Sequence, residues 1–79
     1  MDFEVTVYST PTCTWCRATK EFLIENEIPF RDVDVSRDRM AALEMVQKSG
    51  QMGVPVVDVG GEIVVGFDRR RLSQLLGLV

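Results

Sequence analysis

The order in which strand-like and helix-like segments alternate limits this chain to few folds. Residues 3–8 (FEVTVY) are rich in β-branched and aromatic side chains, and residues 30–35 (FRDVDV) alternate apolar with polar, so both predict strands. Between them, residues 14–26 have a helical spacing of apolar side chains, and Pro29 prevents the helix from continuing. The residues that follow this spacing are Trp15, Ala18, Phe22 and either Leu23 or Glu25, whereas Lys20 and Glu21 fall elsewhere. A strand, a crossover helix and a second strand imply a parallel pair with a right-handed connection.

The second half of the chain predicts a helix, a hairpin and a last helix. Ser36 is the expected N-cap of a helix over residues 37–49, with Gly50 as its C-cap. The buried side of this helix is expected to carry Ala41, Ala42, Met45 and Val46. Two short apolar runs at residues 56–59 and 63–65, joined through glycines, are typical of an antiparallel hairpin.

Asp68 is the expected cap of the last helix, which runs to about residue 76. Its inward side chains are expected to be Leu72, Leu75 and Leu76. The complete order is then β-α-β-α-β-β-α. This order predicts an α/β protein in which helices flank a mixed four-stranded sheet.

Length, charge and cysteine content exclude several classes of protein. The chain has 79 residues and is expected to form one domain over residues 1–79, with a net charge of −3. Its one basic cluster, residues 69–71 (RRR), is too short to indicate nucleic acid as a partner. No apolar run approaches the length of a membrane span, and Asp2 and Glu4 stand where a signal peptide is positive, so we expect a cytoplasmic protein. With two cysteines and no histidine, a histidine-based triad is impossible.

The cysteine pair stands where the first predicted strand passes into the first predicted helix. A helix N-terminus offers unpaired N–H groups and a partial positive charge, which stabilise a thiolate relative to the thiol. Cys13 is expected in the exposed first turn, and Cys16 lies one turn deeper, where the two sulfurs can meet. We therefore expect Cys13 to attack a substrate disulfide and Cys16 to resolve the mixed disulfide.

Several residues near this motif allow two interpretations. Arg17 and Lys20 either add positive potential near the sulfurs or are solvated helix residues, the usual case for charged side chains. Trp15 is either a docking surface or part of the core, and its place between the cysteines favours partial exposure. The cysteines themselves are either redox-active, an inert pair, or half of a metal site that a second chain would complete. Their position between a strand and a helix favours redox chemistry.

Three segments together carry a resemblance to a known family. Residues 8–16 (YSTPTCTWC), 53–57 (GVPVV) and 65–68 (VGFD) resemble the glutaredoxins, and most of all the short glutaredoxin-like redoxins, which include reductants of ribonucleotide reductase. The resemblance covers essentially the whole chain and implies a thioredoxin fold. It also implies a cis peptide between Val54 and Pro55 beside the cysteines, with the Val54 backbone free to pair with a substrate chain. The substrate-binding residues that it implies are Thr12, Trp15, Val54, Pro55, Gly66, Phe67 and Asp68.

Two departures from the family pattern concern glutathione. Many glutaredoxins have Lys or Arg three residues before the first cysteine, against a glutathione carboxylate, and here Thr10 stands there. Where the family shows Gly-Gly-x-Asp-Asp, this chain has Val65 for the first glycine and Arg69 for the second acid. A thioredoxin-like buried acid is absent as well, because Val7 occupies its place. The resemblance therefore implies weak use of glutathione and better reduction by a flavoenzyme of the thioredoxin reductase type.

The leading expectation is a monomeric electron carrier that reduces protein disulfides and has no cofactor beyond a Cys13–Cys16 disulfide. One alternative is a dimer that shares an iron–sulfur cluster, which visible absorption of the purified protein would reveal. The other is a binding module with a vestigial cysteine motif, which would react slowly or not at all with a thiol reagent near neutral pH.

Overall fold

The computed structural model describes residues 4–78, and within them the predicted order of elements is confirmed. The elements are β1 (Val5–Ser9), α1 (Thr14–Glu25), β2 (Arg31–Asp34), α2 (Arg39–Ser49), β3 (Val56–Val59), β4 (Glu62–Val65) and α3 (Arg69–Leu76). The strands form one sheet in the order β2-β1-β3-β4, with β1 parallel to β2 and the other pairings antiparallel. The predicted α/β class and mixed four-stranded sheet are therefore correct.

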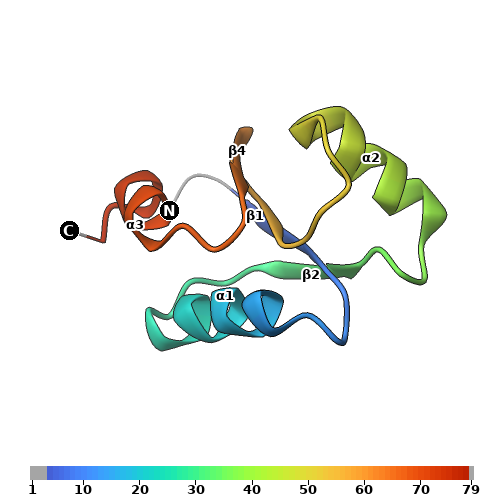
Figure 1. The fold of residues 1–79 in the computed structure, drawn as a ribbon. Coiled ribbons are helices and arrows are strands. Elements are labelled where there is room, and N and C mark those ends of the chain that lie inside the picture. Colours follow the sequence, from blue (N-terminus) through green and yellow to red (C-terminus); the bar gives the residue numbers. More distant parts are fainter. Residues whose placement is uncertain (1–3, 79) are drawn as a thin grey trace.

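The helices divide between the two faces of the sheet. In Figure 1, α3 lies at the left with α1 below it, and α2 lies apart from them at the upper right. The larger core joins α1 and α3 to one face through Val5, Val7, Phe22, Leu23, Ile28, Val57, Val59, Val64, Leu72 and Leu76. The smaller core, under α2, contains Tyr8, Met45 and Val56. Burying one large aliphatic side chain contributes about 1.5–3 kcal/mol, so the larger core fixes α1 and the cysteines at its N-terminus.

The start of α2 differs from the prediction. The helix begins at Arg39 rather than at residue 37, and its N-cap is Asp38, whose carboxylate accepts the N–H of Ala41 at 3.1 Å. Ser36 is not the cap, because its N–H and hydroxyl both donate to the Asp34 carboxylate, at 2.9 and 2.6 Å, and form a turn. Of the predicted buried side, Ala41 and Met45 are buried, whereas Ala42 and Val46 are only half-buried.

The buried side of α1 also differs from the prediction. Trp15 is 64% exposed, and the buried residues are Cys16, Thr19, Phe22 and Leu23. Thr19 is buried at little cost because its hydroxyl donates to the Trp15 carbonyl at 2.8 Å. The inward stripe is therefore rotated by one residue from the one that apolar spacing predicts, and Ala18 is half-buried.

The other boundaries lie within a residue or two of the predictions. β1 ends at Ser9, β2 is shorter than residues 30–35, and β4 begins at Glu62; Phe3, at the predicted start of the first strand, lies outside the described residues. Asp68 caps α3 as predicted, accepting the N–H of Arg71 at 3.0 Å, and Leu72 and Leu76 are buried while Leu75 is half-buried. Gly50 ends α2 with a φ of 74°, which glycine adopts without strain. No helix within residues 4–78 has the length and apolar character of a membrane span.

A polar cluster that the sequence did not predict ties α2 to the sheet. Tyr8 donates its hydroxyl proton to Glu44, while the Lys48 ammonium donates to the Tyr8 hydroxyl at 2.8 Å and to Asp58 at 2.7 Å. The hydrogen bond to Asp58 is the main cause of a raised pKa at Lys48, and burial is the main cause of a raised pKa at Tyr8. The cluster lies on the α2 face, opposite the packing of α1.

Candidate active site

Cys13 occupies the N-cap of α1. Its backbone is extended, with a φ of −89° and a ψ of 116°, and its sulfur accepts the N–H of Cys16 at 3.1 Å. The thiol is half-buried and lies 3.9 Å from the Val54 carbonyl, to which it donates. The first turn of α1 contains no acidic residue to oppose a negative sulfur. The sulfur predicted to be the nucleophile therefore receives a backbone N–H of the helix terminus.

Cys16 lies behind Cys13 and is fully buried. Burial is the main cause that raises the pKa of the Cys16 thiol to about 11, and its hydrogen bond with Cys13 raises it further. A thiol attacks disulfides only as the thiolate. The two cysteines are therefore unequal, because Cys13 is accessible and receives an N–H, whereas Cys16 is inaccessible and held neutral.

The raised pKa of Cys16 predicts that the reduced protein loses stability in alkaline solution. The unfolded thiol ionises near its ordinary value of 9.0, whereas the folded thiol stays neutral until about pH 11. The contribution of the neutral thiol is thus complete below pH 9 and is lost as the pH rises toward 11, by at most about 3 kcal/mol.

Comparing Cys13→Ser with the double variant Cys13→Ser/Cys16→Ala isolates this effect, because Tyr8 and Lys48 also have raised pKa values and contribute equally to both. Urea unfolding from pH 7 to pH 11 should show the stability difference between the two variants changing above pH 9. Parallel curves over that range would show that Cys16 is not held neutral by the fold.

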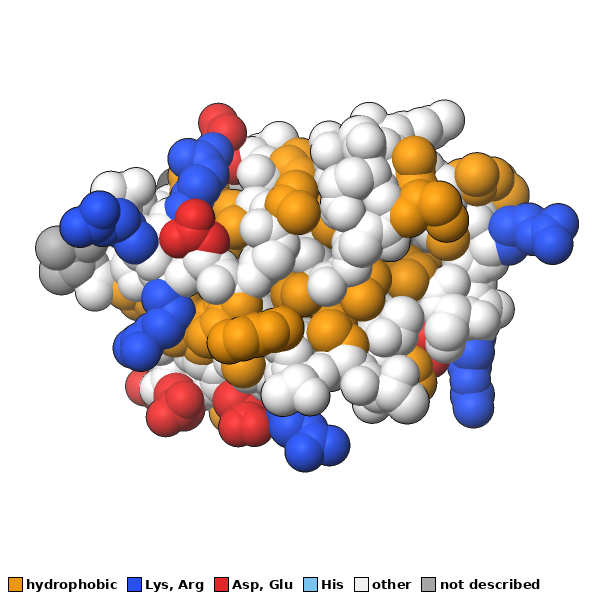
Figure 2. All heavy atoms as spheres, viewed as in Figure 1, with side chains coloured by type: hydrophobic (Ala, Val, Ile, Leu, Met, Phe, Trp, Pro, Cys, Tyr) orange, Lys and Arg blue, Asp and Glu red, His pale blue; other side chains and the backbone are white. Residues whose placement is uncertain are grey.

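A shallow groove of about 270 Å³ lies beside Cys13. It is lined by Trp15, Val54, Pro55, Gly66 and Phe67. The peptide bond between Val54 and Pro55 is cis, as the resemblance implied. The rings of Trp15 and Phe67 lie 6.2 Å apart between centroids. In Figure 2, hydrophobic side chains gather across the middle of the face shown, over the region of α1.

Two residues of the expected substrate-binding set stand outside this groove. Thr12 is exposed in the turn before Cys13, and the Asp68 carboxylate is engaged as the cap of α3. A second groove, of about 380 Å³, is also lined by Cys13 and includes Arg17, Lys20 and Glu21. Cys13 is therefore flanked by an apolar groove and by one of mixed charge.

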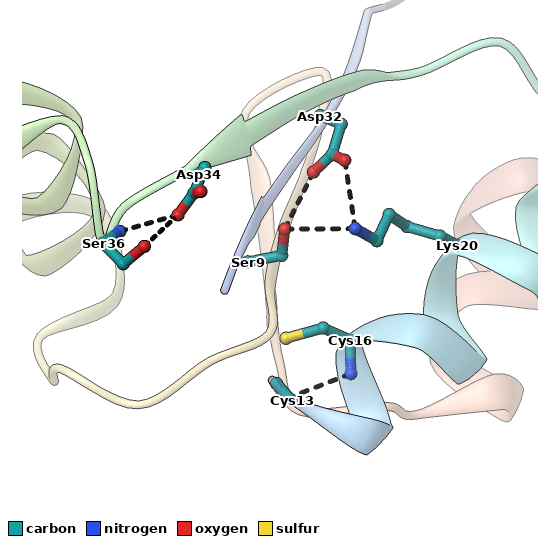
Figure 3. Close-up of polar contacts among 7 residues, drawn as sticks. All are labelled: Ser9, Cys13, Cys16, Lys20, Asp32, Asp34 and Ser36. Atoms are coloured by element: carbon teal, nitrogen blue, oxygen red, sulfur yellow. Dashed lines mark hydrogen bonds and ion pairs between the residues drawn. The ribbon is translucent and has the colours of Figure 1, made fainter. Parts of the chain in front are cut away.

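A group of three polar residues next to Cys16 was not predicted. Figure 3 shows the Cys16 side chain of α1 lying below Ser9, whose hydroxyl donates to Asp32 at 2.8 Å. The Lys20 ammonium donates to Asp32 at 3.0 Å and to Ser9 at 3.4 Å. Lys20 is thus not a freely solvated residue, because only 26% of its side chain is exposed. The signal in the sequence was Lys20 itself, one helical turn after Cys16, but its partners are brought to it only by the pairing of β1 with β2.

The described residues contain no group of three or more cysteine, aspartate or glutamate side chains arranged to hold a metal ion. Cys13 and Cys16 supply two thiols to any metal that they would bind, whereas a tetrahedral zinc site takes four ligands.

Comparisons with known proteins place the chain in a family. The model of the glutaredoxin family matches residues 5–64. The chain is 44% identical over 72 residues to a glutaredoxin-like 8.6 kDa protein in the rubredoxin operon of Clostridium pasteurianum, and the match spans 91% of this chain and 96% of that protein. The chain belongs to the glutaredoxin family. This membership supports thiol–disulfide oxidoreductase activity in general, with redox partners such as glutathione or thioredoxin reductase.

Solved structures agree with the assignment to the glutaredoxin family. A thioredoxin-like protein superposes with a TM-score of 0.91 at 33% identity, covering 100% of both chains. The glutaredoxin-like protein NrdH-redoxin from Escherichia coli superposes with a TM-score of 0.80 at 28% identity, covering 91% of this chain and 93% of that one. The thioredoxin fold implied by the sequence is therefore confirmed.

Proposed function

We propose that this glutaredoxin-family chain is a dithiol–disulfide oxidoreductase that reduces disulfides of other proteins. The observation that carries the proposal is the arrangement of the two sulfurs. Cys13 caps α1 and receives the Cys16 N–H at 3.1 Å, while the thiol of Cys16 is buried one turn behind it. The Cys13 sulfur is thus accessible for attack, whereas the buried Cys16 sulfur can react only with Cys13.

The reaction follows from this inequality in two steps. The Cys13 thiolate attacks one sulfur of the substrate disulfide, and the other substrate sulfur leaves with the bonding electrons and takes up a proton. Cys16 then attacks the Cys13 sulfur, and the substrate sulfur that was bound to Cys13 leaves in the same way. The products are a reduced substrate and a Cys13–Cys16 disulfide, so two electrons pass to the substrate.

The apolar groove is the proposed docking site for the substrate chain. Trp15, exposed despite its size, and Phe67 form one wall, and Val54 lies where its carbonyl meets the Cys13 thiol. An extended substrate segment can lie along the Val54 backbone, which aligns its disulfide with Cys13. We assign Gly66 and Pro55 to the same groove, and Thr12 and Asp68 to its margins.

The electron donor is proposed to be a flavoenzyme of the thioredoxin reductase type rather than glutathione. Thr10 and Arg69 replace the charges with which glutaredoxins are expected to hold glutathione. The solved structure of the similar NrdH-redoxin is described as explaining a thioredoxin-like activity profile. We further propose that the chain acts as a monomer in the cytoplasm, with the Cys13–Cys16 disulfide as its sole redox group.

Reduction of insulin tests the proposed activity. With dithiothreitol as the electron source, micromolar amounts of the protein should shorten the time at which reduced insulin precipitates, because the dithiol relays electrons faster than dithiothreitol reacts alone. Protein alkylated by iodoacetamide after reduction is the matched control and should give the rate of dithiothreitol alone. No acceleration by the untreated protein would contradict the proposal, as would purified protein whose visible absorption shows an iron–sulfur cluster in place of free thiols.

A further inference from the structure

In the second step of the proposed reaction Cys16 must attack as a thiolate, but the fold disfavours the charged form of this buried thiol. Cys16 has no exposed surface, and burial raises the pKa of its thiol to about 11. Near neutral pH only a small fraction of such a thiol is ionised. A group that stabilises negative charge on Cys16 would therefore speed resolution of the mixed disulfide.

The group of Ser9, Lys20 and Asp32 is placed to provide that stabilisation. In Figure 3 the Cys16 sulfur lies below the Ser9 side chain, and the Ser9 hydroxyl points away from the sulfur, toward the Lys20 ammonium and the Asp32 carboxylate. Ser9 is 2% exposed, so it is as enclosed as the thiol, whereas the Asp32 side chain is 47% exposed. The group thus extends from the buried sulfur to the protein surface.

We propose that Lys20, held in place by Ser9 and Asp32, supplies the positive charge that stabilises the Cys16 thiolate during resolution of the mixed disulfide. The inference rests on the proposed function. Lys20, Ser9 and Asp32 are positioning residues, because none of them touches the reacting disulfide. The lysine acts through its charge, and the other two act by keeping that charge beside Cys16.

The other charged groups around Cys16 do not supply this charge. A hydrogen bond from the Thr10 backbone lowers the pKa of Cys16 most, but it carries no net charge. On α1, Cys13 becomes neutral once it is bound to the substrate, and Lys20 is the cation whose charge lowers the pKa of Cys16 further. On β1, Ser9 is uncharged. On β2, Asp32 carries a negative charge that opposes a thiolate, but it is hydrogen-bonded to both Ser9 and Lys20.

Protons and electrons balance without another reactant. The Cys16 sulfur forms a bond with the Cys13 sulfur, the bond between Cys13 and the substrate breaks, and the electron pair leaves with the substrate sulfur. The proton lost by Cys16 is matched by the proton that the departing thiolate takes up. Lys20 exchanges no proton in this step and contributes only its positive charge.

A purely structural role is the competing interpretation, because an ion pair between α1 and β2 would also stabilise the fold. Surface ion pairs contribute about 0–1 kcal/mol to stability. If the ion pair between Lys20 and Asp32 were purely structural, mutating Lys20 would change the melting temperature but leave the ionisation of Cys16 unchanged. The test must therefore measure the ionisation of Cys16 and the rate of resolution.

The first measurement follows the ¹³Cβ chemical shift of Cys16 with pH in a Cys13→Ser background, which needs neither a substrate nor access to the buried thiol. Adding Lys20→Met should move the midpoint of the Cys16 titration to higher pH, and Lys20→Arg should restore most of the change. Arg31→Met is the matched control, since Arg31 is a cation next to Asp32 in β2 whose side chain points to the opposite face of the sheet. An unchanged midpoint in Lys20→Met would overturn the inference.

The second measurement separates the two steps of the reaction with both cysteines present. An uncharged dipyridyl disulfide releases one coloured thione when Cys13 attacks and a second when Cys16 resolves. In Lys20→Met at pH 8, the second phase should slow roughly threefold to tenfold while the first phase keeps its rate. Equal slowing of both phases, or of neither, would contradict the role of Lys20. If the unmutated protein did not reduce insulin, the proposed function would be contradicted instead. The titration of Cys16 would still show whether Lys20 stabilises its thiolate.

Discussion

Replacing Cys13 with serine should abolish disulfide reduction, whereas replacing Cys16 with serine should preserve the first attack and trap the substrate on Cys13. A serine hydroxyl cannot replace a thiolate as the nucleophile, so Cys13→Ser should fall to the rate of the uncatalysed reaction. In Cys16→Ser the Cys13 sulfur keeps its position at the start of α1 and the N–H of residue 16 that it accepts. The attack therefore proceeds, but no second thiol is present to release the substrate.

Intact-mass spectrometry after mixing each variant with oxidised insulin distinguishes the two results. Cys16→Ser should gain the mass of an insulin molecule, and dithiothreitol should remove it, whereas Cys13→Ser should gain nothing. Both variants should keep the circular dichroism of the unmutated protein, since serine is close in size to cysteine. Trapping by Cys13→Ser, or faster alkylation of Cys16 than of Cys13 at neutral pH, would show that the two roles are reversed.

The sequence predicted the order of elements because local signals and tertiary packing agree along most of the chain. Residues 5–8 and 56–59 combine β-branched composition with burial in the central strands β1 and β3. Asp68 was identified as a cap because it stands directly before a helical run with no competing residue nearby. Ser36 was misidentified because serine and Asp38 are both good caps, and only the contact of Ser36 with Asp34 decides between them.

The parts of the candidate site that depend on residues close in sequence could be predicted. The parts that depend on the pairing of strands could not. The places of Cys13 and Cys16 follow from one helical turn. Apolar spacing alone puts Trp15 on the inward side, because it treats all large side chains alike, whereas its place between the cysteines favours the exposure that the structure shows. The buried position is taken by Thr19, whose hydroxyl is satisfied within the helix. The contact of Ser9 with Asp32 joins residues on neighbouring strands, and it could not be predicted from the local sequence around either residue.

The electron donor is the property on which the departures from the glutaredoxin pattern should have their largest effect. Glutathione carries carboxylates and an ammonium group, so tight binding needs cations for the first and an acid for the second. Thr10 supplies no positive charge. Arg69 lies 5.6 Å from the centre of the Phe22 ring, which in turn contacts Phe67 of the apolar groove at 5.9 Å. Arg69 thus puts a guanidinium at the sequence position where the family pattern has an acid, and a guanidinium repels an ammonium.

We therefore expect NADPH to be consumed faster with thioredoxin reductase than with glutathione and glutathione reductase, with the same protein disulfide as substrate. Each missing charge-assisted hydrogen bond costs about 1.5–3 kcal/mol, or roughly one to two decades in affinity. Arg17 lines the second groove beside Cys13 and offsets part of the loss by attracting a carboxylate. The expected advantage of the flavoenzyme is accordingly about tenfold rather than a thousandfold.

Charge restoration tests the cause of this preference. Thr10→Lys and Arg69→Asp should each raise kcat/KM for glutathione by about tenfold, because each supplies one of the missing charges. Arg70→Asp is the matched control for Arg69→Asp, since it makes the same change one residue further along the exposed start of α3. A similar gain in Arg70→Asp would mean that net charge, not the position of Arg69, governs glutathione use. Faster turnover of the unmutated protein with glutathione than with the flavoenzyme would overturn the proposed donor, and would show that Arg17 and Asp68 suffice to hold the tripeptide.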